Sequence, residues 1–495
     1  MEIKYVSTDT TVLYKAATGK SKVVELLWGD RLELLEIDQA APRRKVKARG
    51  GKVGYVNASD IGDESLLEIY FIDVGQGDGV LIKSPDFRHI MIDGGYKRKS
   101  QPSGKNAADF VDWKFAKDYG LDQIHLDAIL ASHNDADHYG GLSDLLDVAQ
   151  SAELDAQSIR VNAFYHAGIS WWINPETGER WLGKKSEDKQ YITQILGNRQ
   201  AVVSALTPGA IPELQGEWAT FLKRVSQART IDGSETPIHR LSQTTDFLPG
   251  FTGNNGGLAI RVLAPLETEV DGEPALRSYS SADSKNTNGN SILLRLDYGH
   301  ARIILTGDLN KDSQRALLEA YGNNTEEFRC DVAKACHHGS DDISYEFLNT
   351  MTPAVTVLSS GDNEGHDHPR PNIVAASATT GYIEVVDDKL VSPLIYSTEL
   401  ARSNNLGRPT KLTVHGNNGS IFDRDQLNQV ELGVAVTKAG NLNPQTVNVR
   451  LDQAFVLADL IYGLVNVRTD GKKILCATLN ERDSSWEIKK INARF

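Results

Sequence analysis

A chain of 495 residues exceeds what one hydrophobic core usually supports, so two or more domains are expected. Hydrophobic residues make up 40% of the chain and charged residues 24%, values that exclude a disordered or fibrous protein. The net charge of −13 argues against wholesale wrapping of nucleic acid, although a local basic patch can still bind phosphate within an acidic protein.

The cysteines and the N-terminal residues indicate the compartment. Cys330, Cys336 and Cys476 are too few and too irregularly spaced for a disulfide framework or a cysteine-based zinc site. The polar N-terminus lacks the apolar run of a signal peptide, and no window approaches the length needed to cross a bilayer. We therefore expect a cytoplasmic protein without membrane contact; its oligomeric state stays open.

Residues 1–62 show the pattern of a small β-barrel, with the short strands TTVLYKA, VVELLWGDRLELLEI and RRKVKARGGKVGYVN separated by glycines. The run GDRLELLE followed by GKVGYVNASDI resembles the bacterial SH3-like family. That resemblance implies a domain able to bind a partner protein. Its basic hairpin, RRKVKARGGK, is either a surface for nucleic acid or simply a charged hairpin.

From Leu66 onward the strands become strongly apolar. LLEIYFIDVGQGDGVLI and FRHIMIDGG predict two strands with a Gly-rich hairpin, followed by helical residues 106–119 and the strand LDAILASH, with a further helix at 142–150. Residues 167–256 form an insertion. In it Trp171, Trp172 and Trp181 accompany Lys184 and Lys185, a mixture found in base-stacking surfaces, although core or lid packing is the favoured interpretation.

Strands resume with GLAIRVLAP (257–265) and SILLRLDYGHARIILTGDL (291–309), followed by a helix at 311–321, DVAKACHHGS and AVTVLSSG. Two rounds of strands interleaved with helices predict two packed sheets with helices outside. Residues 395–495 read as a β-rich C-terminal extension of unknown role.

Metal-binding residue types gather in SHNDADHYGG, where His133, Asp135, Asp137 and His138 lie within six positions after an apolar strand. Imidazole and carboxylate suit zinc or manganese, and the spacing suits two neighbouring cations. The alternative is a solvated polar loop with Asx turns.

Further candidate ligands also follow strand-like runs. Asp308 follows ARIILTG, His337 and His338 follow DVAKAC, and His166 follows RVNAFY. A shared sheet edge would gather these side chains, although His166 also fits a buried core histidine.

HNDADH is similar to the metallo-β-lactamase metal signature in the variant where Asp replaces the second His. The flanking motifs FIDVGQGDGVLI, MIDGG, NGNSILLRL, ILTGD, HHGS and GHDHP resemble the ComEC/Rec2-like branch, over roughly residues 66–370. The resemblance implies a metallo-β-lactamase αββα four-layer sandwich over residues 66–394, preceded by the SH3-like barrel. The branch comprises nucleases associated with DNA uptake, and the same ligand variant occurs in phosphorylcholine esterases.

The resemblance also implies two divalent metal ions, Zn²⁺ or Mn²⁺. The implied ligands are His133, Asp135 and His166 for one ion, Asp137, His138 and His338 for the other, and Asp308 as a bridge. Asp93 and Asp78 would orient these ligands through hydrogen bonds.

The expected reaction is hydrolysis of a phosphodiester in DNA or RNA by a hydroxide that the two metals activate. The catalytic candidates are Asp137, Asp308, His337 and His368. Phosphate contacts are expected from Lys97, Arg98 and Lys99 in the loop YKRKS, and from Arg370. Two alternatives remain: hydrolysis of a small phosphodiester, lactone or thioester, and a partner-binding protein with a vestigial metal site.

Overall fold

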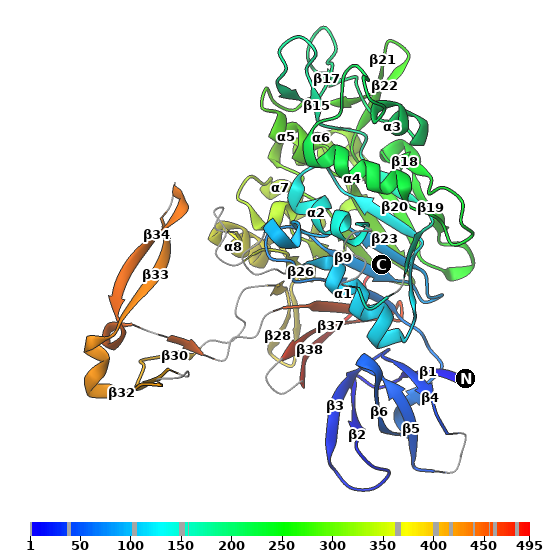
Figure 1. Ribbon diagram of the computed structural model, residues 1–495. Coiled ribbons are helices and arrows are strands. Elements are labelled where there is room, and N and C mark those ends of the chain that lie inside the picture. Colours follow the sequence, from blue (N-terminus) through cyan, green and yellow to red (C-terminus); the bar gives the residue numbers. More distant parts are fainter. Residues whose placement is uncertain are drawn as a thin grey trace.

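The computed structural model describes residues 2–36, 41–100, 106–147, 154–156, 158–361, 368–398, 405–414, 419–438, 441–454, 456–458, 463–480 and 485–495. Figure 1 shows an N-terminal β unit, a central α/β body and a small β unit formed by residues 405–458. The candidate metal ligands all lie in the central body.

The N-terminal unit is an antiparallel sheet with the strand order β3-β2-β6-β5-β4-β1-β7. Its strands are β1 (Glu2–Val6), β2 (Thr10–Tyr14), β3 (Lys22–Leu27), β4 (Arg31–Leu34), β5 (Arg43–Ala48), β6 (Lys52–Asn57) and β7 (Ile61–Gly62). Alternating apolar residues such as Leu13, Leu32 and Val46 form its own core. The expected antiparallel strands are therefore present, whereas closure into an SH3-like barrel stays a prediction.

The first sheet of the body has the strand order β18-β14-β12-β10-β9-β8-β36-β37-β38. Its strands are β8 (Leu67–Phe71), β9 (Val80–Lys83), β10 (His89–Ile92), β12 (Ala128–Ala131), β14 (Phe164–His166), β18 (Ile238–Arg240), β36 (Val465–Thr469), β37 (Lys473–Asn480) and β38 (Ser485–Asn492). Strands β10, β12, β14 and β18 run parallel. Their carboxyl ends therefore share one edge.

The second sheet has the order β19-β20-β23-β24-β25-β26-β29. Its strands are β19 (Phe247–Thr252), β20 (Ala259–Ala264), β23 (Leu293–Tyr298), β24 (Ala301–Leu305), β25 (Val332–Lys334), β26 (Val355–Leu358) and β29 (Leu394–Ser397). Strands β24, β25, β26 and β29 are parallel.

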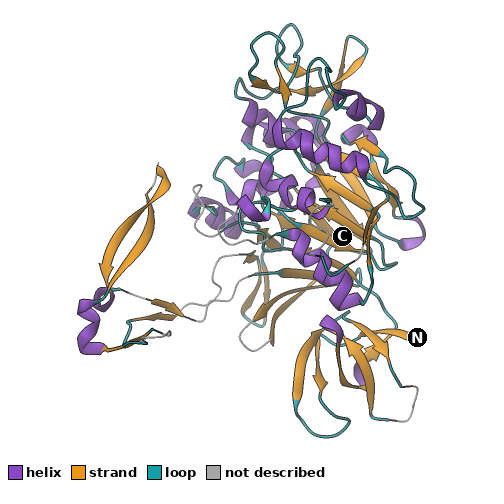
Figure 2. Ribbon diagram, viewed as in Figure 1, coloured by secondary structure: helices purple, strands orange, loops and turns teal. Residues whose placement is uncertain are grey.

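The two sheets pack face to face, and helices cover their outer faces (Figure 2). The helices are α1 (Ala107–Trp113), α2 (Ala136–Leu145), α3 (Arg199–Ala205), α4 (Gly216–Gln227), α5 (Asp283–Gly289), α6 (Lys311–Tyr321), α7 (Tyr345–Met351) and α8 (Pro371–Thr380). In β12, Leu130 packs between the sheets while Ile129 packs toward α1, α2 and α4. Both faces of this strand are covered, which is why it is apolar throughout. The body is a mixed α/β sandwich of two packed sheets with helices outside, the layering that the sequence predicted.

Helix α2 lies closer to the motif than the sequence suggested. We expected a helix at 142–150, but α2 spans Ala136–Leu145, with Asp135 at its N-cap. Asp137 and His138 therefore lie in the first turn, where their spacing is set by helix geometry.

The C-terminal residues divide between two places. Strands β36 to β38 join the first sheet, and β36 pairs with β8, so part of the expected extension 395–495 lies within the body. Pairing between strands so distant in sequence leaves no local signal. The outlying unit contains the hairpins β30 (Asn405–Gly407) with β35 (Val456–Ala458), β31 (Lys411–Thr413) with β32 (Ile421–Asp423), and β33 (Glu431–Lys438) with β34 (Asn441–Arg450).

Short sheets occupy the insertion and the surface of the body. They are β11 (Gln123–Leu126) with β13 (Ser158–Val161), β15 (Trp172–Ile173) with β16 (Arg180–Trp181), β17 (Tyr191–Ile192) with β22 (Glu273–Arg277) and β21 (Glu267–Val270), and β27 (Glu384–Val386) with β28 (Lys389–Ser392). Among the helices of the described residues, none has the length and apolar character needed to cross a membrane.

Candidate metal centre

The candidate ligands lie where parallel strands of both sheets end. His133 follows β12, Asp308 follows β24, and His337 and His338 follow β25. Because β24 and β25 are parallel, and β12 belongs to the facing sheet, these strand ends meet at one edge of the sandwich. The edge is buried: His133, Asp308 and His338 are each at most 3% exposed.

Asp308 lies at the centre of this cluster. Its Oδ2 atom is 3.1 Å from Nε2 of His338, 3.2 Å from Nε2 of His138, 3.9 Å from Nε2 of His337 and 4.0 Å from Nε2 of His133. One carboxylate oxygen thus faces imidazoles from two separate segments, the motif and the turn Cys336–Gly339. This central position is compatible with the bridging role that the resemblance implied for Asp308, which stays a prediction.

The two other aspartates of the motif lie at opposite ends of the cluster. Asp135 Oδ2 is 3.7 Å from Nε2 of His133, whereas Asp137 Oδ2 is 3.5 Å from Nε2 of His338. The division of these residues between two ions stays a prediction. Within the described residues, ligand atoms of Asp78, His138, Asp308 and His338 all lie within 4.8 Å of one another.

Hydrogen bonds orient the three histidine rings through Nδ1. His138 Nδ1 lies 2.8 Å from Asp93 Oδ2, His338 Nδ1 lies 3.1 Å from the Ser359 carbonyl oxygen, and His133 Nδ1 lies 3.0 Å from Ser132 Oγ. The Nε2 atoms of all three rings are buried and form no hydrogen bond to the described residues. Donation from Nδ1 leaves a lone pair on Nε2, as metal ligation requires, so the residues fit divalent metal ions.

Asp93 and Asp78 lie behind the rings. Asp93 Oδ1 also accepts from the Ser132 backbone N–H at 2.7 Å, which fixes the start of the motif loop. Asp78 faces Nδ1 of His338 at 3.2 Å and Nδ1 of His138 at 3.9 Å. Since the Nε2 atoms of both rings face Asp308 instead, this geometry suits orientation of the rings better than ligation.

Lys334 is a charged residue of the site that the sequence analysis did not identify. Its Nζ atom forms an ion pair with Asp78, lies 3.6 Å from Asp308 Oδ1 and donates to the Gly307 carbonyl at 3.0 Å. The side chain is 1% exposed. A lysine inside the apolar strand before HHGS was the available signal, because buried lysines require charged partners.

His166 lies on β14 in register with Ala131 of β12 and is 1% exposed. The Gly168 backbone N–H donates to its Nδ1 at 3.2 Å, which leaves the proton of a neutral ring on Nε2. This hydrogen bond suits a metal ligand less well than those of His133, His138 and His338. Ligation by His166 stays a prediction.

The charges of the cluster influence one another strongly. Burial raises the pKa of Asp135 to about 7, and the negative charge of Asp137 adds to the rise. Burial also lowers the pKa of His133 to about 3. Burial opposes protonation of His138 and His338, but the carboxylate of Asp308 outweighs it and raises the pKa of both. Without a metal, these two rings carry protons that a divalent cation would displace.

His337 and His368 lie at the outer side of the cluster. His337 and His338 both adopt positive φ angles, 48° and 53°, in the tight turn Cys336–Gly339. Asn288 Nδ2 lies 3.3 Å from His337 Nε2, and the ring centroids of His337 and His368 are 5.6 Å apart. Residues 365–367 of the GHDHP motif lie outside the described residues.

Of the four residues expected to contact phosphate, Lys97, Arg98 and Arg370 have partners in the structure that the sequence did not predict. Lys97 is 7% exposed, and its Nζ donates to Glu217 Oε1 at 2.7 Å, so it does not overhang the site freely. Arg98 forms an ion pair with Asp109. Lys99 is exposed, and Arg370 forms the N-cap of α8, where its backbone N–H donates to the Gly339 carbonyl at 2.8 Å. Their contact with phosphate stays a prediction.

No family model matches the sequence. The chain is 22% identical to ComE operon protein 3 of Bacillus subtilis (strain 168) over 318 residues, which are 62% of this chain and 30% of that protein. It is 37% identical to competence protein ComA of Neisseria gonorrhoeae over 83 residues, 17% of this chain and 12% of that protein. The chain therefore spans less than a third of the length of these curated relatives.

Solved structures resemble the chain weakly. Tm1679, a metal-dependent hydrolase of the beta-lactamase superfamily, is 13% identical with a TM-score of 0.31, covering 67% of this chain and 95% of that one. A diphosphatase from the PhnP family is 14% identical with a TM-score of 0.28, covering 62% and 90%. These similarities carry no conclusion about function.

Proposed function

We propose that this chain, a metallo-β-lactamase-fold protein with distant similarity to two competence proteins, is a metal-dependent phosphodiesterase that cleaves DNA or RNA. The observation that carries the proposal is the set of buried Nε2 atoms on His133, His138 and His338, which face the Asp308 carboxylate without hydrogen-bond partners among the described residues. Imidazoles held in this way are arranged for cations.

The cluster divides naturally into two ligand groups. His133 and Asp135 would hold one ion, with His166 as the predicted third ligand, and Asp137, His138 and His338 would hold the other. Asp308 would contact both. Two divalent ions here would lower the pKa of a water molecule toward neutrality and stabilise charge on the attacking and leaving oxygens.

His337 is the side chain of the cluster best placed to contact a phosphoryl oxygen. Its side chain is 25% exposed, and burial lowers its pKa, which favours the neutral ring. The Asn288 amide donates to Nε2, so the proton stays on Nδ1, which has no hydrogen-bond partner among the described residues.

The phosphodiester substrate is supported by the similarity to competence proteins and by Asp135, which stands where the lactam-cleaving relatives of this fold have a histidine. Asp135 adds a third carboxylate to those of Asp137 and Asp308. The net positive charge of the centre with two dications bound is therefore smaller than with a histidine at this position. The same charge balance would serve a small phosphodiester, so the substrate needs a direct test.

The test couples metal content to activity. Purified protein is analysed by mass spectrometry for bound metal and assayed on linear DNA, plasmid DNA and RNA with Mn²⁺ or Zn²⁺, beside a panel of a small phosphodiester, a lactone and a thioester. We expect about two metals per chain and cleavage of nucleic acid. Activity confined to the small esters would overturn the nuclease assignment, and absence of metal and activity after reconstitution would overturn hydrolysis altogether.

A further inference from the structure

A hairpin of the insertion lies directly against the metal-binding loop. Strands β15 and β16 pair Trp172 with Trp181, and the preceding Trp171 donates its indole N–H to the Asn134 carbonyl at 3.1 Å. Asn134 stands between the candidate ligands His133 and Asp135. The insertion is thus attached to the motif itself, and not only to the outside of the body.

Arg180, on the same hairpin, stacks on Trp171. Its guanidinium carbon lies 3.6 Å from the centroid of the indole ring. The residue is exposed, and within the described part of the chain it forms no ion pair. A guanidinium that lies over an aromatic face still has its N–H groups available as donors, and their fork matches a phosphate.

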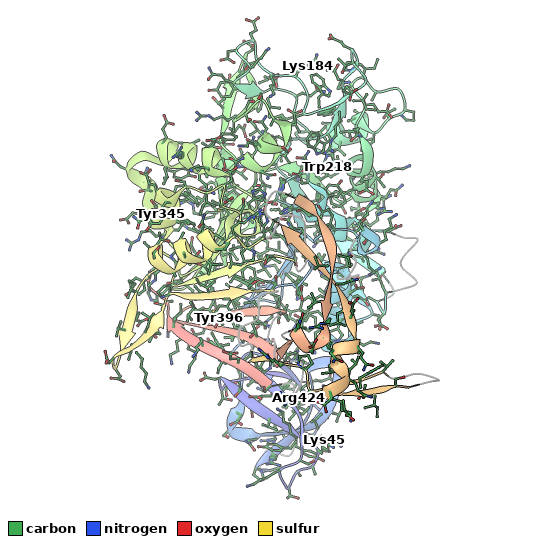
Figure 3. All side chains as sticks on the ribbon, turned by 90° about the vertical axis from the view of Figure 1, so that its left-hand side faces the viewer. Lys45, Lys184, Trp218, Tyr345, Tyr396 and Arg424 are labelled. Atoms are coloured by element: carbon green, nitrogen blue, oxygen red, sulfur yellow. The ribbon has the colours of Figure 1, made fainter. Side chains whose placement is uncertain are left out.

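A cavity of about 290 Å³ lies between this arginine and the metal-binding loop. Its walls include Asn134, Tyr139, Trp171, Arg180, Glu217 and Trp218. Trp218, on α4, is labelled in Figure 3 and marks this side of the site. The volume is close to the lower limit of small-ligand sites, about 300 Å³, so the cavity suits one phosphate-bearing unit of a longer chain.

The charge of the cavity favours an anion. Glu217 is the acidic residue of the wall, and Lys97 lies 2.7 Å from its carboxylate and balances its charge. Arg180 is then the basic residue of the wall without an ion pair among the described residues, and its charge also acts on the Asp135 carboxylate. The aromatic side chains Trp171, Trp218 and Tyr139 are each at most 6% exposed, so they form the floor and support Arg180.

We propose that Arg180, supported by Trp171, binds a phosphate that neighbours the scissile phosphate, which makes a polynucleotide the preferred substrate over an isolated phosphodiester. The inference rests on the proposed function and specifies its substrate class. It also gives the insertion a role, because the hairpin joins this arginine to the motif loop.

The experiment compares thymidine dinucleotides that differ only in a neighbouring phosphate. TpT contains the scissile phosphodiester alone, whereas pTpT and TpTp each carry one additional phosphate. For the wild type, kcat/KM is expected to be higher for at least one of the longer anions than for TpT. In Arg180→Gln this ratio should fall by about 10- to 100-fold, the effect of one charged hydrogen bond.

Two further variants separate the explanations. Arg180→Lys keeps the charge but loses the planar stack, and should give an intermediate ratio. Arg329→Gln is the matched control, because Arg329 is also exposed and lies over an aromatic ring, Phe495 at 5.9 Å, but precedes β25 at the end opposite His337. Its ratio should equal that of the wild type.

Binding provides a readout independent of turnover. In chelator, anisotropy of labelled oligothymidylate should show a log Kd against log salt slope smaller by about 0.7 in Arg180→Gln, as expected for one lost contact to single-stranded phosphate. An unchanged substrate ratio together with an unchanged slope would overturn the role of Arg180 while leaving the nuclease proposal intact. A wild type that binds these oligonucleotides but cleaves none would instead contradict the proposed function.

Discussion

Lys334 Nζ lies 3.6 Å from Asp308 Oδ1, while the other oxygen of the same carboxylate faces the imidazoles of the cluster. The same ammonium group contacts Asp78, which faces Nδ1 of His338. The buried ammonium group of Lys334 therefore positions both Asp308 and Asp78, and Asp78 in turn orients the ring of His338. Burial opposes its charge, but the carboxylates outweigh that effect and raise the pKa of Lys334.

Replacing Lys334 by Met should destabilise the metal-free protein by about 3–5 kcal/mol, because Asp78 and Asp308 would be left buried without their cation. Bound metals would offset part of this loss by neutralising Asp308. The difference in Tm between the metal-bound protein and the protein in chelator should therefore be larger for Lys334→Met than for the wild type. Lys285→Met, at an exposed lysine, is the control. If Lys334→Met lost the same stability with and without bound metal, Lys334 and the metals would not share the neutralisation of Asp308.

Replacing Asp308 by Asn preserves the shape of the side chain but removes the charge that faces four histidines. Metal content should fall, and hydrolysis should decrease by about 100-fold or more. Asp312→Asn, on the exposed side of α6, is the matched control and should behave as the wild type. Mass spectrometry and a nuclease assay measure both effects. Full metal content in Asp308→Asn would exclude Asp308 as a ligand.

The burial of His89, which lies outside the metal centre, predicts that the free energy of unfolding depends on pH. His89 is 2% exposed against Phe87, Phe115 and Tyr119, and burial lowers its pKa to about 3 from an ordinary 6.5. Below pH 6.5 the unfolded chain therefore binds a proton at His89 that the folded protein does not bind. The stability that the neutral, buried His89 contributes is fully present above pH 6.5 and is lost as the pH falls toward 3. Between pH 7 and 5 the loss should be about 2 kcal/mol.

The check is the free energy of unfolding of wild type and His89→Gln at both pH values. Glutamine can still accept the hydrogen bond from the Tyr119 hydroxyl, which lies 3.3 Å from His89 Nε2. The variant should lose about 2 kcal/mol less than the wild type over this interval. Identical pH dependence in the two proteins would refute the assignment.

Arg468 joins the C-terminal strand β36 to the N-terminal unit. Its guanidinium lies 2.8 Å from Asp30 Oδ1, donates to the Trp28 carbonyl at 2.6 Å and is 2% exposed. Arg468→Met should cost about 3–5 kcal/mol, because Asp30 would lose its charged partner. Limited proteolysis should then release residues 1–62 earlier than in the wild type. The control Arg450→Met, at an exposed arginine, should change neither property.

Several features of the fold follow from local sequence. The strand before HNDADH, the strands before Asp308 and His338, and α6 over Lys311–Tyr321 have the expected positions. Apolar runs that end on a histidine or aspartate are local patterns, and parallel strands bring such ends to one edge. Residue type also limits the chemistry, since imidazole and carboxylate are ligands for zinc or manganese.

Other features depend on contacts between distant segments. Sequence alone placed Lys97 beside the substrate, but Glu217 pairs with it across the insertion. The start of α2 inside the motif and the pairing of β36 with β8 were likewise unexpected.

The sequence by itself determined the types of the candidate ligands, their placement at strand ends and the class of chemistry that such residues suit. The tertiary structure decided which nitrogen of each histidine faces Asp308, that Lys334 pairs with the carboxylates beside the rings, and that Arg180 lies beside the motif without an ion pair among the described residues. The physical reason is that residue type and strand position are encoded locally. Ring orientation and charge pairing are instead set by neighbours that only the packing of distant segments brings together.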